Sequence, residues 1–229
     1  MARQKYHDRL ARLRGNVGAM ADLVVERYRL SVDVLESGDS RTAERVIDGD
    51  DELNAWYLDI EGDCVELIGQ YEALASDLRC IASSFKIVTD LERIGDLSTN
   101  LAAYGQESNG SLPERIPITS IASTAGEMVE DAMEAYTKQN ADLARAVVER
   151  DDELDDACRR ASEKIVRELV AASRTAGKPA TSADNIDDRI ESVTRALLTI
   201  RDLERVGDHA VNICARTVYM LENDTELIY

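Results

Sequence analysis

The chain is poor in proline and aromatic residues, and these shortages narrow the kind of protein it can be. Three prolines and a 4% aromatic content, among many Ala, Leu, Glu, Arg and Asp residues, favour helices over strands. With 44% hydrophobic residues, the chain should fold into a globular structure rather than stay disordered. Its 229 residues suffice for one large core or two small ones.

Long apolar runs and clusters of basic residues are missing too. No apolar stretch approaches the roughly 18 residues that span a bilayer, and the first residues lack the apolar segment of a signal peptide. A net charge of −18 argues against binding to nucleic acid or to anionic lipid. These absences predict a cytoplasmic protein with no nucleic-acid partner and no direct membrane insertion.

Lysine is scarce, although arginine and aspartate are plentiful. Such a surface suits a protein adapted to high salt, because dissolved ions screen the repulsion between its many acids. We therefore expect a halophilic source. Cysteine forms no C-x-x-C pair, which argues against a zinc or redox motif. We expect the four cysteines to be small buried apolar side chains: Cys64, Cys80, Cys158 and Cys214.

The most informative feature present is a duplicated motif. Asp-Leu-Glu-Arg-Ile-Gly-Asp at 90–96 recurs as Asp-Leu-Glu-Arg-Val-Gly-Asp at 202–208, and an Asn follows each copy at the same distance. Upstream, Asp-Asp-Glu-Leu-Asn at 50–54 is matched by Asp-Asp-Glu-Leu-Asp at 151–155. The chain is therefore a duplication of one plan, in which a loop with Gly, Pro and Ser at 177–184 lengthens one connection of the second half.

Helical periodicity dominates both halves, and no segment alternates with the period of a strand. We expect an all-α fold of two tandem, duplicated three-helix bundles side by side, at residues 1–108 and 115–229. The best boundary is the Gly105 to Pro117 segment, with its two prolines and small polar residues. The expected helices span 5–37, 40–73, 76–105, 117–138, 141–174 and 184–223.

On a helix, the duplicated motif presents two stripes. The first has core spacing of three and four, and it comprises Ile87, Leu91, Ile94, Ser98 and Leu101, then Leu203, Val206, Ala210 and Ile213. The second lies about 100° round and carries two acids and an amide in each copy: Glu92, Asp96 and Asn100, then Glu204, Asp208 and Asn212. Asp90 and Asp202 lie at the edge of this second stripe.

Acids spaced by four on a helix repel each other by a few tenths of a kcal/mol, which Arg93 and Arg205 offset in part. A single copy would be interpreted as a solvated acidic face with local ion pairs. Its recurrence with the same glycine, Gly95 or Gly207, favours a site, because a mid-helix glycine costs about 1 kcal/mol relative to alanine. We expect these glycines to admit a neighbouring helix or a ligand beside the acids.

Stacked carboxylates and an amide oxygen form a set of hard oxygen ligands that suits Fe, Mn, Mg or Ca, with Zn as a further candidate. A neighbouring helix must supply the remaining ligands. The candidates are Asp51 or Asn54 in the first half and Asp152 or Asp155 in the second. A plain surface role is equally compatible with the pattern of these four residues.

At these residues the sequence resembles the PhoU family of phosphate-uptake regulators, over nearly the whole chain. The resemblance rests on the length, the two halves and the L-E-R-[IV]-G-D-x-x-x-N pattern near the end of each half. It implies two similar three-helix bundles and metal ions, iron or zinc in some members, held as mono- or multinuclear clusters by the paired E-x-x-x-D motifs. In this chain the implied ligands are Glu92, Asp96, Asn100, Glu204, Asp208 and Asn212, with Asp90 and Asp202 as close neighbours.

The resemblance also implies a role. Bacterial members restrain phosphate uptake through the ATPase subunit of the phosphate transporter, and they help a membrane histidine kinase to sense phosphate supply. We therefore expect a metal-binding regulator that negatively regulates phosphate uptake and phosphate signalling. Its expected partners are that ATPase subunit and, where the source has one, the histidine kinase. A homodimer is compatible with a bundle of this kind.

Two other interpretations stay open. Ferritin-like enzymes bind two irons in a carboxylate-rich helical bundle, but they use Glu-x-x-His, and neither His7 nor His209 has a Glu three residues before it. His209 also has Leu97 at its place in the first copy, so we expect it to lie outside the duplicated site. The other alternative is a purely structural interaction bundle. We expect no catalysis, because the chain has no Gly-rich phosphate loop and no H-E-x-x-H motif.

Overall fold

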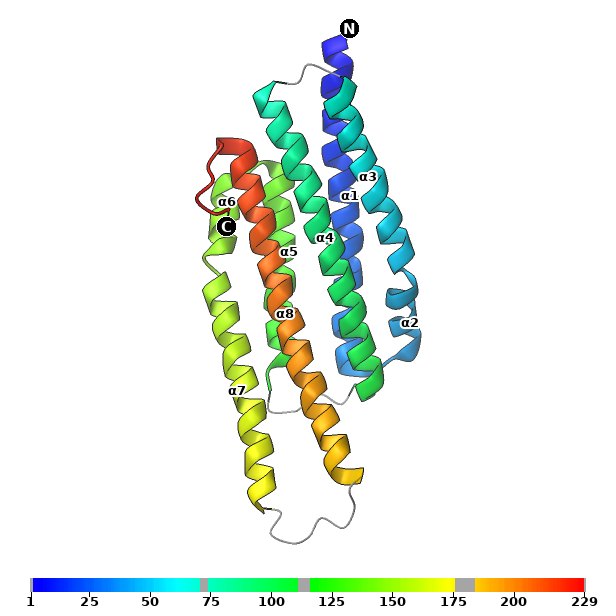
Figure 1. Cartoon of the computed structure of the whole chain (residues 1–229), viewed down its shortest axis with the longest axis vertical. Coiled ribbons are helices and arrows are strands. Elements are labelled where there is room, and N and C mark those ends of the chain that lie inside the picture. The colour runs from blue at the N-terminus through cyan, green and yellow to red at the C-terminus, as the bar shows by residue number, and fades with distance from the viewer. Residues whose placement is uncertain (1, 71–73, 111–115, 176–183, 229) are drawn as a thin grey trace.

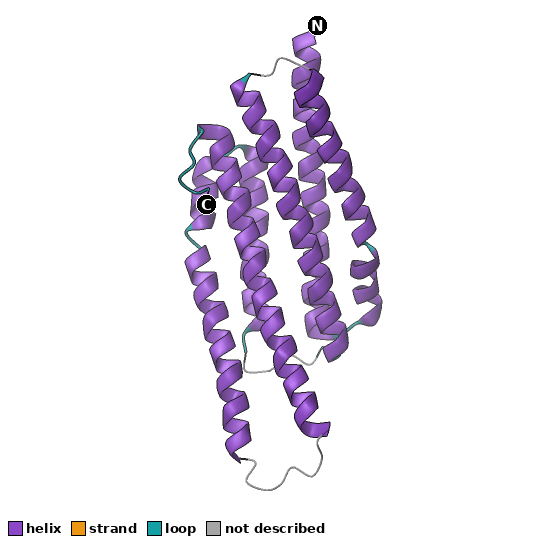
Figure 2. Cartoon of the chain, viewed as in Figure 1, coloured by secondary structure: helices purple, strands orange, loops and turns teal. Residues whose placement is uncertain are grey.

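The computed structural model describes residues 2–70, 74–110, 116–175 and 184–228, and within these ranges helices are joined by short turns without any strand (Figure 2). The all-α prediction is confirmed. Most of the loop expected at 177–184, and part of the expected boundary at 111–115, lie outside the described residues. The helices are α1 (Ala2–Ser37), α2 (Ser40–Asp48), α3 (Asp50–Gln70), α4 (Ala75–Ser108), α5 (Ile118–Lys138), α6 (Ala141–Val148), α7 (Asp151–Thr175) and α8 (Asp184–Glu222).

The middle helix of each half is divided into two helices, so the prediction of unbroken helices over 40–73 and 141–174 is wrong. In the first half the division falls at Gly49, where a side chain would meet the guanidinium of the buried Arg27 at 2.9 Å. The division makes the repeated Asp-Asp-Glu the first turn of both α3 and α7. Acids are favoured there, because the free N–H groups of a helix start carry partial positive charge.

Equivalent residues of the duplication also start the short helices. The Asp39 carboxylate accepts a hydrogen bond from the backbone N–H of Thr42 at 3.1 Å, which caps α2. The Asn140 side chain accepts one from the N–H of Leu143 at 3.1 Å, which caps α6. Such a cap satisfies one of the N–H groups that a helix start leaves without an internal partner. Each half therefore repeats the same local turns as well as the same helices.

The two halves lie side by side, with the helices of residues 1–108 in one and those of 115–229 in the other (Figure 1). The antiparallel helices α4 and α8 pack against each other across the boundary, and so do α1 and α5. Helices α3 and α7 lie at the two outer edges (Figure 1). This arrangement brings the two duplicated motifs to one central pair of helices.

One hydrophobic core runs through both halves rather than one core in each. Both predicted core stripes are buried along α4 and α8, so this prediction is confirmed. The four cysteines are free and buried, as expected. Burial, and then the charges of Glu204 and Asp155, raise the thiol pKa of Cys158 to about 12, which keeps this side chain in its unreactive form. Among the described residues, no helix combines the length and apolar character needed to cross a bilayer.

Candidate functional site

Within each half, the Asp-Asp-Glu-Leu segment contacts the helix that carries the Asp-Leu-Glu-Arg motif. A Cβ at Gly95 of α4 would lie 2.0 Å from a methyl carbon of Leu53, and one at Gly207 of α8 would lie 2.3 Å from a methyl carbon of Leu154. Both leucines are almost fully buried. The glycines thus leave room for the leucine of the repeated Asp-Asp-Glu-Leu, as close approach of a neighbouring helix requires. This contact places the acids of α3 beside those of α4, and the acids of α7 beside those of α8.

In the second half, three carboxylates converge. Asp151 and Asp155 of α7 and Asp208 of α8 each offer an oxygen, and these oxygens all lie within 4.8 Å of one another. Asp151, Leu154 and Asp155 share one face of α7. Because Leu154 packs against Gly207, this face is turned toward α8 and the three carboxylates meet. The Oδ1 atom of Asp151 is buried and has no hydrogen-bond partner among the described residues.

The electrostatics of this cluster favour an added positive charge. Burial, and then the charges of Asp155 and Asp208, raise the pKa of Asp151 to about 6. Partial burial and Asp155 also raise the pKa of Asp208, and the same two causes raise that of Glu204, one turn earlier on α8. Each shift means that the charged form is disfavoured where it stands. A cation bound among these oxygens would remove that penalty.

The first half repeats the arrangement with one carboxylate fewer. Asn54 stands where the second half has Asp155, and its amide donates a hydrogen bond to Asp50 at 3.0 Å. Burial, Asp96 and Asp50 raise the pKa of Glu92, while the neighbouring Arg93 lowers it. Arg93 lies 3.3 Å from Asp96 and 3.5 Å from Glu92. Of the two halves, only the second brings three described acids within 4.8 Å.

Asp51 and Asp152, the middle-helix candidates named first from the sequence, are not part of these groups. Both are exposed, and the residue before each one, Asp50 or Asp151, faces the neighbouring helix instead. Asp152 precedes Leu154 by two positions, which places it about 200° round the helix from that buried side chain. Asp155, the other candidate from the sequence, does lie in the cluster.

The first acid of each duplicated motif forms a hydrogen bond with the Asn that follows the motif of the other half. Asn212 donates to the carboxylate of Asp90 at 3.3 Å, and Asn100 donates to that of Asp202 at 3.4 Å. Tyr104 donates a second hydrogen bond to Asp202 at 3.1 Å. Asp202 is fully buried, and Arg201 pairs with its carboxylate at 2.9 Å. These contacts join α4 to α8 across the boundary, in a position that the spacing of the motif alone did not indicate.

His209, which was expected to lie outside the duplicated site, makes a contact that the sequence did not predict. Its Nδ1 lies 2.9 Å from the Asp90 carboxylate, which makes it a further link between the halves. This contact leaves no signal in the sequence, because Leu97 occupies the equivalent position and the partner acid is 119 residues away. Tyr104 was missed for the same reason, since the equivalent residue in the second half is Arg216.

A family model described as the PhoU domain matches the chain twice, at residues 17–104 and 118–217. The chain belongs to the PhoU family. Each match falls within one half of the duplication, so the family unit and the repeated helical plan coincide. The family explains why the halves carry the same motifs at α3 and α4 and again at α7 and α8.

PhoU proteins from several bacteria are similar over nearly the full chain. The "Phosphate-specific transport system accessory protein PhoU homolog" of Pseudomonas aeruginosa is 30% identical over 95% of this chain and 86% of its own length. The PhoU accessory protein of Escherichia coli is 26% identical over the same shares. The crystal structure of PhoU from Pseudomonas aeruginosa matches with a TM-score of 0.86 at 29% identity, over 96% of this chain and 100% of that one. The PhoU regulatory protein of Streptococcus pneumoniae matches with a TM-score of 0.80 at 25% identity, over 96% and 98%.

Proposed function

We propose that this chain is a non-enzymatic regulator of phosphate uptake that binds metal ions at its acid clusters. Family membership supports the regulatory part, since the relatives bear the names of accessory proteins of phosphate-specific transport rather than of enzymes. The proposed partner is the ATPase subunit of the phosphate transporter, with a phosphate-sensing histidine kinase as a second partner where the source has one. Restraint of uptake is the proposed direction of the effect.

The observation that carries the metal site is the buried Asp151 oxygen without a partner, beside two further carboxylates. An unpaired buried carboxylate oxygen destabilises a protein unless a donor or a cation satisfies it. Asp151, Asp155 and Asp208 would hold the ion, with Glu204 as a fourth oxygen donor within the same acidic surface. In the first half, Asp50, Glu92 and Asp96 are the corresponding donors.

The chemistry of the donor atoms limits which metal ions suit the proposed site. All the proposed ligands are hard oxygen donors, which suit Fe, Mn or Mg, whereas Zn more often takes nitrogen or sulfur ligands. A bound ion would neutralise the repulsion between the acids of α7 and α8 and hold the two helices together. Asp90, Asp202, Asn100 and Asn212, which the sequence placed among the ligands, instead have the role of aligning α4 with α8 in this proposal.

The test is phosphate uptake in the source organism. A strain that lacks this chain should take up more radiolabelled phosphate in phosphate-rich medium, and the wild-type chain should restore restraint. The variant Asp151→Asn/Asp155→Asn/Asp208→Asn should restore it poorly, whereas the exposed-site control Asp51→Asn/Asp152→Asn should restore it fully. The wild-type chain should also copurify with the transporter ATPase subunit. Equal uptake with and without the chain would contradict the regulatory role.

A further inference from the structure

An apolar groove crosses the last turns of α3, the first turns of α4 and the last turns of α8. It has a volume of about 410 Å³ and is lined mainly by apolar side chains, including Val65, Ile68, Ile81 and Phe85. Val65 is 63% exposed and Ile68 53%, although an aliphatic side chain is ordinarily sheltered from water. The exposed Leu58 lies two helical turns before Val65 on the same face of α3, which extends the apolar surface along the helix.

Two cationic side chains line this groove. Lys86 of α4 and Arg216 of α8 line it, and neither forms an ion pair with any residue that the structure describes. Asp90, the acid nearest to Lys86 along α4, is already bound by His209 and Asn212. Two unpaired cations beside an apolar surface are unusual in a chain of net charge −18.

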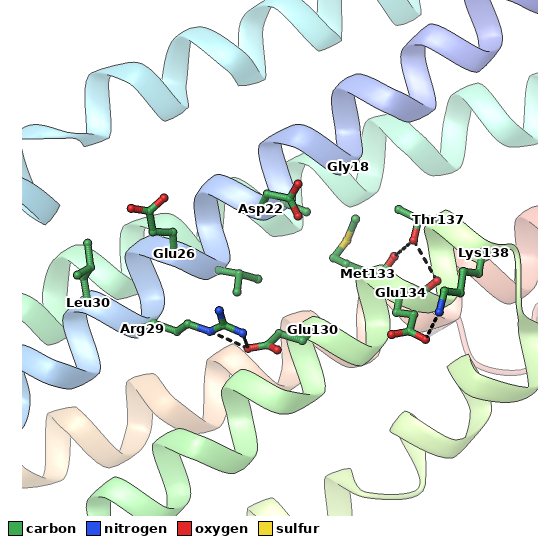
Figure 3. A pocket seen from close by; sticks show the side chains of 12 residues that line it. Gly18, Asp22, Glu26, Arg29, Leu30, Glu130, Met133, Glu134, Thr137 and Lys138 are labelled. Atoms are coloured by element: carbon green, nitrogen blue, oxygen red, sulfur yellow. Dashed lines mark hydrogen bonds and ion pairs between the residues drawn. The ribbon is translucent and has the colours of Figure 1, made fainter.

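Two other hollows among the described residues lack this combination. In the groove between α1 and α5, Arg29 pairs with Glu130 at 2.7 Å and Lys138 pairs with Glu134 at 2.6 Å (Figure 3). The hollow that the duplication makes equivalent has Leu198 in place of Lys86 and Tyr104 in place of Arg216.

That equivalent hollow does contain an arginine, Arg195, but two acids neutralise it. Glu107 lies 3.2 Å from its guanidinium and Glu191 lies 2.7 Å away. A further hollow between α7 and α8 has one arginine, Arg189, beside apolar side chains, and it also contains an acid, Glu168. Among these hollows of the described residues, the groove of α3, α4 and α8 differs in having two cations without an ion pair and no acid in its lining.

We propose that this groove binds an amphipathic helix of a partner protein that presents an apolar face flanked by acidic residues. The stripe from Leu58 to Ile68 extends along a helix, and an amphipathic helix covers such a surface with side chains spaced at three and four. Carboxylates of that helix would pair with Lys86 and Arg216, and this pairing would select an acidic partner against the net charge of the chain. The groove is separate from the acid clusters, so this inference stands independently of metal binding.

The test uses the full chain and two synthetic peptides. Both are helical with the same leucine face, and one has glutamates and the other lysines on the flanks. Fluorescence anisotropy should show the glutamate peptide binding at least about tenfold more tightly, although the net charge of −18 would by itself attract the lysine peptide. The variant Lys86→Glu/Arg216→Glu should reverse the preference. The control Arg41→Glu/Arg167→Glu, with the same charge change on exposed residues away from the groove, should leave it unchanged.

A second variant separates the groove from general attraction between charges. Val65→Asn/Ile68→Asn changes exposed side chains and should leave the melting temperature unchanged while it weakens binding of the glutamate peptide about tenfold. Equal affinity for the two peptides, no binding of the glutamate peptide, or binding that survives this variant would overturn the proposal. So would a dimer of the chain that dissociates in the same variant, because the groove would then be an interface between two copies.

Discussion

At the scale of single residues, the two halves differ at one equivalent position, which is Asn54 in the first half and Asp155 in the second. The amide of Asn54 supplies a donor that Asp50 accepts, so the first half satisfies internally what the second half leaves open. Asp155 supplies another negative charge, which adds to the raised pKa values of Asp151, Asp208 and Glu204. The presence of Asp155 rather than an Asn therefore makes the second-half cluster the stronger candidate for a cation-binding site.

This difference gives a reciprocal prediction. Asp155→Asn should weaken the tighter of two Mn²⁺ binding events by at least about tenfold, because it removes one charged ligand and leaves an amide. Asn54→Asp should strengthen the weaker event, because it restores the second carboxylate of α3. Isothermal titration of the metal-free full chain measures both. Identical binding curves for the two variants would contradict the assignment of these residues.

The raised pKa of Asp151 predicts a pH dependence in the metal-free protein. A carboxyl whose pKa is about 6 when folded and 3.8 when unfolded binds its proton more tightly in the folded state. Its contribution to stability is therefore present at low pH and is lost as the pH rises through about 6. Asp151→Asn mimics the protonated form, so with a chelator it should raise the melting temperature at pH 7 and lose this advantage toward pH 4.

Circular dichroism melts across this pH range measure the effect. The control Asp152→Asn removes one charge from the exposed neighbour and should raise the melting temperature less at pH 7. A gain from Asp151→Asn that is constant between pH 4 and pH 7 would show that the carboxyl does not titrate in the way its surroundings indicate.

Sequence spacing predicted the acid stripe of α4 and α8 and offered Asp155 as a partner, but it named Asp51 and Asp152 in place of Asp50 and Asp151. The repeat Asp-Asp-Glu-Leu does not reveal which of its first two acids faces α8, and only the docking of Leu154 on Gly207 settles this. The contact between His209 and Asp90 could not be predicted either, because it depends on the position of α4 relative to α8 along their axes. Contacts within one helix follow from its period, whereas contacts between distant helices require their relative position.

At the scale of helices, the glycines decide how closely neighbours approach. The sequence predicted that Gly95 and Gly207 admit a neighbouring helix or a ligand, and the leucines of α3 and α7 fill that space. The division of the middle helices was not predicted, since residues 47–51 and 148–152 contain no proline and the helical pattern continues through them. The first of these divisions falls at Gly49, a residue of low helix preference that also leaves room for the Arg27 guanidinium.

A matched pair of glycine substitutions tests this account. Gly15→Ala in α1 meets nothing within 4 Å, so it should stabilise the chain by about 0.5–1 kcal/mol through helix preference alone. Gly207→Ala gains the same preference, but it must displace the buried Leu154 at a cost of about 1–3 kcal/mol. Urea unfolding should therefore show Gly207→Ala as the less stable variant. Equal stabilisation by both substitutions would contradict the close contact of α7 with α8.

At the scale of the whole molecule, duplication and charge dominate. The two halves could be predicted from the repeated motifs, and the all-α class from periodicity and composition. The shared core could not, because residues such as Tyr28, whose hydroxyl donates to the Ala122 carbonyl of the other half at 2.7 Å, give no sign of it in the sequence. The net charge of −18 is spread over this single body, so the acids of both halves repel one another.

This repulsion predicts a response to salt. The melting temperature should rise steadily as KCl increases to molar concentration, because ions shorten the range of repulsion to about 3 Å at 1 M. The account of a salt-adapted source depends on this rise, and a melting temperature that is flat across the series would contradict it. A parallel series in sucrose serves as the control, since sucrose stabilises folded proteins without screening charge.

The central claim, that the acid cluster of α7 and α8 is a metal site, is tested most directly by metal analysis of the full chain purified without chelator. Mass spectrometry of the elements should find Fe, Mn or Mg bound to the wild-type chain and to the control Asp51→Asn/Asp152→Asn. Asp151→Asn/Asp155→Asn/Asp208→Asn should lose the metal of the second-half cluster, and so bind less metal in total, while its circular dichroism spectrum stays helical. Equal metal in this folded variant and the wild-type chain, or no metal in either after incubation with each ion, would contradict the claim.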